Sequence, residues 1–352
     1  MTRQPYVGRR PLHRPEDGDQ PIPGVEPEPE CVVVGTLSPK GGCAKTTVTA
    51  TLNMDRVHNH GDTTLTVDLD AQANMTSHLT YSEEANGNIS RALLESMDGW
   101  TPEHYSENVT TTKVPSIAMR YDLVAGDTSF EETLLLLEYR RRRDPSIVFR
   151  LKEALDELRP YYHYIFIDTP PSLRGLTVDL TLHAADVIIM PIDGTDAIIG
   201  MLNLLPIIQT ANHERVLRGD APLQLYFTVG KYLPIPKATP VGPYGVKAEE
   251  WFQVMYEAFP KHFIPAAVLT TLSPERPSQP GDTWRAMTAV AKHDYRRLCA
   301  EVFSRISDQS IPAFPDWLQS TAFNPEDLRL KVREVRAKNR NNSVVSRARF
   351  FR

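Results

Sequence analysis

A glycine-rich segment with two lysines is the part of this sequence best suited to chemistry. It lies between an apolar β-branched run and a helical pattern, so it forms the turn from a strand to a helix. Backbone N–H groups of such a turn, with the helix N-terminus behind them, form a cradle for anions. Within it, Lys45 would reach the β- and γ-phosphates of a nucleotide, and the Thr46 hydroxyl would bind Mg²⁺. The segment reads Ser38-Pro39-Lys40-Gly41-Gly42-Cys43-Ala44-Lys45-Thr46-Thr47.

Acidic residues end two apolar runs farther along the chain. Asp168 follows Tyr164-Ile165-Phe166-Ile167, and Asp68 and Asp70 close the run that begins at Thr64. Side chains two residues apart on a strand point to the same side, so Asp68 and Asp70 can both face one cleft. A nucleotide site in a parallel sheet needs an acid near the metal at the end of a neighbouring strand. These acids meet that need.

The pattern of apolar runs predicts the fold that must position these residues. Short runs that read as buried strands alternate with helical patterns such as 45–59, 89–97, 147–158 and 251–259. This alternation predicts an α/β protein with a single doubly wound, mostly parallel sheet and helices on both faces. The predicted strands span 31–37, 64–70, 121–125, 164–168, 186–191, 223–229 and 263–269.

Composition divides the 352 residues into three parts. Residues 1–30 hold seven prolines and few large aliphatic side chains, so we expect a disordered arm. Residues 31–310 carry the strands and helices of one α/β domain, which includes the glycine-rich turn. Residues 311–352 form a C-terminal extension with a basic helical tail.

Composition also excludes several classes of protein. The three cysteines are isolated and show no C-x-x-C spacing, which argues against a disulfide framework or a structural zinc site. No apolar run approaches the ~18 residues of a membrane span, and the N-terminus lacks the apolar core of a signal peptide. We therefore expect a cytoplasmic protein. Its net charge of −5 gives no overall attraction to nucleic acid, so such binding would need local basic patches.

Three segments, in this order along the chain, resemble the deviant Walker A, A′ and B motifs of the ParA-type ATPases in the ParA/MinD superfamily. They are Lys-Gly-Gly-x-x-Lys-Thr-Thr from Lys40, Asp-Leu-Asp-x-Gln-x-Asn from Asp68, and Ile-Asp-Thr-Pro-Pro-Ser from Ile167. The resemblance covers roughly residues 31–306 and is weakest over 82–115 and 231–250. It implies an Mg²⁺-dependent ATPase that forms a homodimer on binding ATP.

The resemblance also implies roles for individual residues. Lys40 matches the signature lysine that reaches the partner subunit's phosphates, Lys45 the Walker lysine, and Asp70 the acid that orients the attacking water. The implied metal site consists of Thr46, Asp68 and Asp168. The implied nucleotide contacts are Lys40, Gly41, Gly42, Cys43, Ala44, Lys45, Thr46 and Thr47.

Two residues depart from the family pattern. Ala44 stands where the family has glycine, and a positive φ there would strain alanine by about 1 kcal/mol or more. Pro39 precedes Lys40 and would stiffen the approach to it. Because of Ala44, the sequence predicts nucleotide binding more firmly than it predicts the loop geometry or the hydrolysis rate. The sequence lacks an Asn-Lys-x-Asp segment for reading guanine, which favours ATP over GTP.

Two basic clusters could contact nucleic acid. Arg140 to Arg143 form a run, and residues 328–352 hold nine Lys/Arg against one acid. Either cluster can also be a solvated face. We expect the tail to contact duplex DNA through its phosphates without reading sequence. The candidate DNA-binding residues are Arg329, Lys331, Arg333, Arg336, Lys338 and Arg340.

The resemblance leads to one main hypothesis of function and two alternatives. The main hypothesis is a nucleoid-associated partition ATPase for plasmid or chromosome, which binds nonspecific DNA with ATP and is stimulated by a ParB-like partner. The first alternative is a metabolic P-loop synthetase or kinase. The second is a MinD-like positioning ATPase whose basic C-terminus anchors on membrane, which the ParA-like motifs disfavour.

Overall fold

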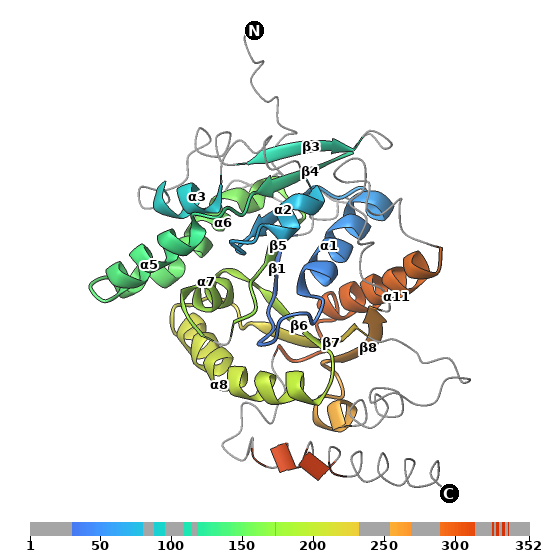
Figure 1. The fold of residues 1–352 in the computed structure, drawn as a ribbon. Helices are drawn as coiled ribbons and strands as arrows, with labels where there is room; N and C mark the ends of the chain where they lie inside the picture. Colours follow the sequence, from blue (N-terminus) through green and yellow to red (C-terminus); the bar gives the residue numbers. More distant parts are fainter. Residues whose placement is uncertain are drawn as a thin grey trace, which may run out of the picture.

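An eight-stranded sheet forms the centre of the computed structural model (Figure 1). The strand order is β3-β4-β2-β5-β1-β6-β7-β8, and neighbouring strands run parallel except for β3, which pairs antiparallel with β4 at one edge. The structure describes residues 30–79, 88–95, 109–114, 119–172, 174–231, 254–268 and 289–313, together with 326, 329, 330, 333, 334 and 337.

The inner strands are almost continuously buried, as expected of a parallel sheet covered on both faces. In β2, β5 and β6, all but the first residue of β5 are buried. The strands are β1 (Val32–Thr36), β2 (Thr64–Asp68), β3 (Thr110–Val114), β4 (Met119–Val124), β5 (Tyr164–Asp168), β6 (Val187–Ile192), β7 (Gln224–Lys231) and β8 (Phe263–Val268).

Helices cover both faces of the sheet and bury two separate apolar clusters (Figure 1). On one face lie α1 (Lys45–Asp55), α2 (Asn74–Leu79) and α11 (Ala289–Ile306). On the other face lie α3 (Ile89–Glu95), α5 (Phe130–Arg141), α6 (Arg150–Leu158), α7 (Leu176–Ala184) and α8 (Thr195–Leu217). The predicted doubly wound α/β fold is therefore confirmed. Among the described residues, none of the helices is long and apolar enough to cross a bilayer.

The structure differs from the sequence prediction at several elements. Strand β3 and helix α5 were not predicted. Strand β3 lies at the edge of the sheet and its polar sequence lacks the apolar run of a buried strand. Helix α5 ends in consecutive arginines, a pattern that indicates a basic cluster and not part of a helix. The predicted helix 147–158 begins as a 3₁₀ segment, Pro145–Phe149, and the first predicted helix ends in a π-helical turn, Arg56–His60. Strand β2 ends at Asp68, so Asp70 lies in the turn beyond it and not on the strand. Of the predicted helix 251–259, residues 251–253 lie outside the described residues.

The predicted domain boundaries stay predictions, because the arm and most of the C-terminal extension lie outside the described residues. Residues just beyond 310 still bond to the domain. The carbonyl of Ala313 accepts from the Leu225 N–H at 3.1 Å, and the carbonyl of Pro312 lies 2.8 Å from Nε2 of His262.

The sheet order brings the predicted site to one edge. Strand β1 lies between β5 and β6, and β2 lies beyond β5, so the carboxyl ends of these four strands are neighbours. In such open sheets ligands bind outside the carboxyl ends, where the strand order reverses. The glycine-rich turn leaves β1 at this point and enters α1 at Lys45.

Ala44 has φ 70° and ψ 30°, in the left-handed region, so the condition under which we expected strain is met. We predict that Ala44→Gly raises the free energy of unfolding by up to about 1 kcal/mol. Relief of the left-handed strain is the cause, and the greater freedom of glycine in the unfolded chain offsets part of it. The matched control is Ala50→Gly inside α1, which should lower stability by about 1 kcal/mol. Urea denaturation of both variants measures whether each free energy of unfolding rises or falls relative to the wild type. A lower value for Ala44→Gly would contradict the prediction.

Candidate nucleotide-binding site

The turn between β1 and α1 presents backbone groups that suit an anion. No side chain of the described residues caps the N-terminus of α1, and its first turn holds no acidic residue. The first N–H groups of a helix have no partner within the helix, so they remain available to a ligand. Gly42 has φ 80°, and a Cβ there would meet nothing within 4 Å. The turn is therefore uncrowded at Gly42, whose positive φ favours glycine.

Lys45 lies buried beneath this turn, with 6% of its surface exposed. Its Nζ donates to the carbonyl of Lys40 at 3.4 Å. Burial lowers the pKa of Lys45, while the nearby Asp168 and Asp70 favour its charged form. A buried ammonium with a long bond to one carbonyl has donors to spare, and an anion in the turn would satisfy them.

Asp168 ends β5 next to Thr36 of β1 and is fully buried. The Thr46 hydroxyl donates to its Oδ2 at 2.7 Å, and the Thr49 hydroxyl lies 3.2 Å from its Oδ1. Because Thr46 gives its proton to Asp168, its oxygen lone pairs remain free to bind a cation. This contact joins the start of α1 to the end of β5.

Asp68 ends β2 in register with Asp168 and is also fully buried. It accepts from the Thr76 N–H and hydroxyl at 2.8 Å each, and from the Asp70 N–H at 3.1 Å. Burial raises the pKa of both carboxyls, and the charge of Asp68 raises that of Asp168 further. Burial and mutual repulsion disfavour the charged forms of these two carboxyls. A cation bound beside them would offset that cost, so the pair favours cation binding.

Asp70 lies beyond the strand, with 8% of its surface exposed. Its Oδ1 accepts from the Gln72 N–H at 2.9 Å, which fixes the turn after β2. Gly126 packs against this turn: a Cβ there would lie 2.7 Å from the Asp70 carbonyl oxygen and 2.9 Å from Cγ of Asp68. Only glycine allows the residues after β4 to approach this closely.

Lys40 does not point at the buried pair of acids. Its Nζ lies 3.1 and 3.0 Å from the two carboxylate oxygens of Asp193, which follows β6. Asp193 was not among the candidate residues, although it lies only two residues beyond the predicted strand 186–191. Thr49, Thr76 and Gly126 were also missed, because nothing in their local pattern separates them from ordinary core or loop residues.

The structure therefore brings together the predicted phosphate-binding turn, Lys45, Thr46 and the three acids, while Lys40 lies to one side. It describes two of the six candidate DNA-binding residues, Arg329 and Arg333. Arg329 contacts Glu326 and Asn203 of its own chain. The remaining four, Lys331, Arg336, Lys338 and Arg340, lie outside the described residues. In the other basic cluster, Arg141 pairs with Asp179 at 2.6 Å.

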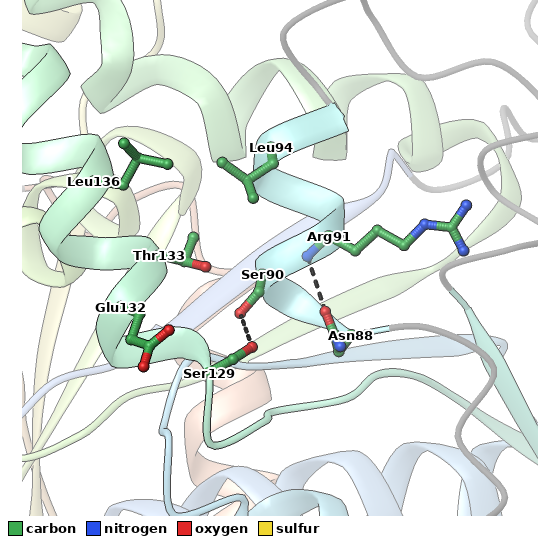
Figure 2. Close-up of a pocket in the computed structure, with 8 residues that line it drawn as sticks. All are labelled: Asn88, Ser90, Arg91, Leu94, Ser129, Glu132, Thr133 and Leu136. Atoms are coloured by element: carbon green, nitrogen blue, oxygen red, sulfur yellow. Dashed lines mark hydrogen bonds between the residues drawn. The ribbon is translucent and has the colours of Figure 1, made fainter.

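A separate groove of about 700 Å³ lies between α3 and α5 (Figure 2). Ser90 and Ser129 are hydrogen-bonded across it, and the Arg91 N–H bonds to the Asn88 side chain at its rim. None of the predicted site residues lines this groove, so it is distinct from the phosphate-binding turn.

Comparison with known sequences supports the motif resemblance. A ParA family protein of Chlamydia pneumoniae is 28% identical over 184 residues, 52% of this chain and 68% of that protein. A chromosome partitioning protein ParA of Myxococcus xanthus is 33% identical over 154 residues, 44% of this chain and 49% of that protein. The matches span about half to two thirds of these relatives, so the likeness does not extend to their whole length.

Solved structures of low sequence identity share the fold. Apo McdA from Cyanothece superposes with a TM-score of 0.56 at 17% identity, covering 77% of this chain and 99% of that one. Cobyrinic acid a,c-diamide synthase from Mycobacterium smegmatis, with bound ADP and magnesium, superposes with a TM-score of 0.54 at 19% identity, covering 81% and 99%. The same architecture thus occurs in proteins of different activity.

The AAA_31 family, described as an AAA domain, matches residues 32–218. The matched residues run from the start of β1 to just past the end of α8, and so include the turn, the three acids and Asp193. Together with the ParA family relatives, this match over more than half of the chain shows that the protein belongs to the AAA_31 family of P-loop ATPase domains, of the ParA/MinD type.

Proposed function

We propose that this protein is a partition ATPase that dimerises on binding ATP and Mg²⁺, binds duplex DNA without sequence preference in that state, and returns to the monomer after hydrolysis. A ParB-like partner would stimulate hydrolysis, and the cargo would be a plasmid or a chromosome. The observation that supports this most strongly is the uncapped N-terminus of α1 above the buried Lys45. That arrangement suits the β- and γ-phosphates of a nucleotide.

The residues around Asp168 fit a magnesium ion. Mg²⁺ is usually held by one or two carboxylates, nucleotide phosphates and water, and not by a cage of protein ligands alone. Thr46 would be the direct ligand, and Asp68 and Asp168 would hold it and the surrounding water in place. When bound, Mg²⁺ would neutralise the β- and γ-phosphate oxygens.

The chain's own residues would then divide the work of hydrolysis. Water attacks the γ-phosphorus while the bond to the β-phosphate oxygen breaks, and Asp70 would orient that water. Lys45 would hold the β- and γ-phosphates from its own subunit. Lys40 would add a positive charge from the partner subunit, where negative charge develops on the transferred group.

DNA contact is proposed for the basic C-terminal tail. A dimer presents two tails, so ATP could turn a weak contact into a stronger bivalent one. Because phosphate contacts release counterions, such binding would weaken steeply with salt. This mode would concentrate the protein on the nucleoid.

The alternative of a metabolic synthetase is supported by the likeness to cobyrinic acid a,c-diamide synthase, whose fold is as similar as that of McdA. The ParA family relatives and Lys40 favour partition instead.

Gel filtration with light scattering, run with ATP, ADP and no nucleotide and with and without duplex DNA, separates these functions. A dimer that forms only with ATP and binds DNA supports partition. A monomer under all conditions, unaffected by DNA, would favour the metabolic enzyme. ATP-dependent binding to anionic liposomes in place of DNA would favour a MinD-like role.

Two lysine substitutions should separate nucleotide binding from dimerisation. Lys45→Ala should abolish ATP binding, because it removes the buried charge at the phosphates. Lys40→Ala should bind ATP normally yet remain monomeric, because its contact exists only across the dimer. Calorimetry and light scattering measure the two effects, and each variant is the control for the other. Normal ATP affinity of Lys45→Ala, or an ATP dimer of Lys40→Ala, would contradict the assignment.

Asp70→Ala should bind ATP and dimerise but hydrolyse ATP at least about 100-fold more slowly, because it loses the group that orients water and keeps the phosphate contacts. Phosphate release at saturating ATP measures the rate. Unchanged turnover would show that another acid orients the water.

Asp168→Asn should lose Mg²⁺-dependent ATP binding and yet stabilise the nucleotide-free protein. Burial raises the pKa of Asp168 in the folded protein, so the folded protein loses stability as the pH rises above the pKa that this carboxyl has in the unfolded chain. Asparagine does not ionise and removes this loss. The gain in melting temperature in EDTA should therefore grow from about pH 4 to about pH 7 and level off above that.

The matched control for Asp168→Asn is Asp186→Asn. That substitution removes the charge of Asp186 and turns one of the two oxygens that accept from Arg159, at 2.8 and 2.9 Å, into an N–H donor, so it should lower the melting temperature. A loss of stability in Asp168→Asn that is independent of pH would contradict the prediction.

A further inference from the structure

Lys40 forms an ion pair within its own subunit. Its Nζ lies 3.0–3.1 Å from both carboxylate oxygens of Asp193, in the loop between β6 and α8. The Asp193 side chain is 15% exposed and that of Lys40 46% exposed. The aspartate end of the pair is therefore largely shielded from solvent. Solvent and salt screen this ion pair less than they screen one between two fully exposed side chains.

The backbone beside this pair is held in place from two sides. Gly200 in α8 leaves the space that the Pro39 ring occupies: a Cβ there would lie 2.6 Å from Cγ of Pro39. On the other side, the carbonyl of Lys40 accepts from Lys45 Nζ at 3.4 Å and from the Cys43 thiol at 3.1 Å. Pro39 therefore docks the start of the turn against α8, within reach of Asp193.

The charges around Lys40 favour this position. Burial lowers the pKa of Lys40, but the hydrogen bond and attraction of Asp193 outweigh it, so the pKa lies above its ordinary value. Asp196, in the first turn of α8, adds attraction. A lysine ammonium is a compact point charge on a flexible stem, so bound between both oxygens of Asp193 it cannot also neutralise a phosphate in another subunit.

We infer that Asp193 is a positioning residue that retains Lys40 in the nucleotide-free subunit, so that dimerisation requires Lys40 to exchange Asp193 for the phosphates bound by the partner subunit. The inference rests on the proposed ATP-dependent dimer. Each dimer breaks two such pairs, and their loss opposes association. Asp193 thereby raises the protein concentration at which the ATP-bound protein dimerises.

The experiment uses Asp193→Asn, which keeps the shape of the side chain and removes its charge. The dimer dissociation constant in saturating ATP and Mg²⁺ should fall about three- to ten-fold, since two half-exposed pairs no longer have to break. Analytical ultracentrifugation measures it. ATP affinity at protein concentrations below dimerisation should stay unchanged, because among the described residues the Asp193 carboxylate is hydrogen-bonded to Lys40 and not to Lys45 or Thr46.

Two controls separate this contact from a general effect of charge. Asp196→Asn removes the same charge from the same end of α8 and should change the dissociation constant less. In a Lys40→Ala background, which should remain monomeric, adding Asp193→Asn should not restore ATP-dependent dimerisation, because the lysine that Asp193 retains is gone. Asp193→Glu, which keeps the charge, serves as the folded reference if Asp193→Asn is poorly folded, and it should dimerise no more tightly than the wild type.

An unchanged dissociation constant in Asp193→Asn would overturn the inference, and a weaker dimer would mean that Asp193 instead aims Lys40 at the partner. If the wild type fails to dimerise with ATP at all, the proposed function fails, and the inferred restraint on dimerisation fails with it. The ion pair itself is tested separately without nucleotide. Lys40→Ala and Asp193→Ala should be non-additive in unfolding free energy, whereas additive effects would remove the contact on which the inference depends.

Discussion

Two carboxylates buried side by side, Asp68 and Asp168, constrain the rest of this site. Placing two acids in the interior of a sheet is unfavourable unless fixed donors and a positive charge compensate them. The hydroxyls of Thr46 and Thr76 supply donors, and Lys45 supplies a positive charge. The compensation joins α1 to β5 and α2 to β2. Much of the local architecture thus follows from the need to keep these acids in place.

The two halves of the site differ in how firmly they are held. The acids and Lys45 are buried, with Asp68 and Asp168 bonded to residues of α2 and α1. Lys40 instead extends over the surface and is retained by one carboxylate and the packing of Pro39. Local rearrangements draw on the regions with the fewest buried contacts, so a change between monomer and dimer would involve Lys40 before the acids.

The fold alone does not reveal what the ATPase acts on. McdA and a diamide synthase superpose on this chain about equally well, because a doubly wound sheet positions a phosphate site without specifying the rest of the reaction. What separates partition from synthesis must therefore lie in particular residues and not in the fold. Lys40 is the residue that we propose for this role, because its ammonium lies against Asp193 and away from the buried acids, where it could act between subunits.

The sequence by itself determined the class of fold, the position of the phosphate-binding turn and the strand-end acids, because buried strands, glycine turns and terminal acids leave local patterns. It also showed that Ala44 departs from the family. Only the tertiary structure decided that the Ala44 backbone is left-handed, that Gly126 closes against Asp68 and that Asp193 retains Lys40. The last two contacts join segments about 60 to 150 residues apart in the chain, and no local spacing encodes a contact that depends on how the strands are ordered in the sheet.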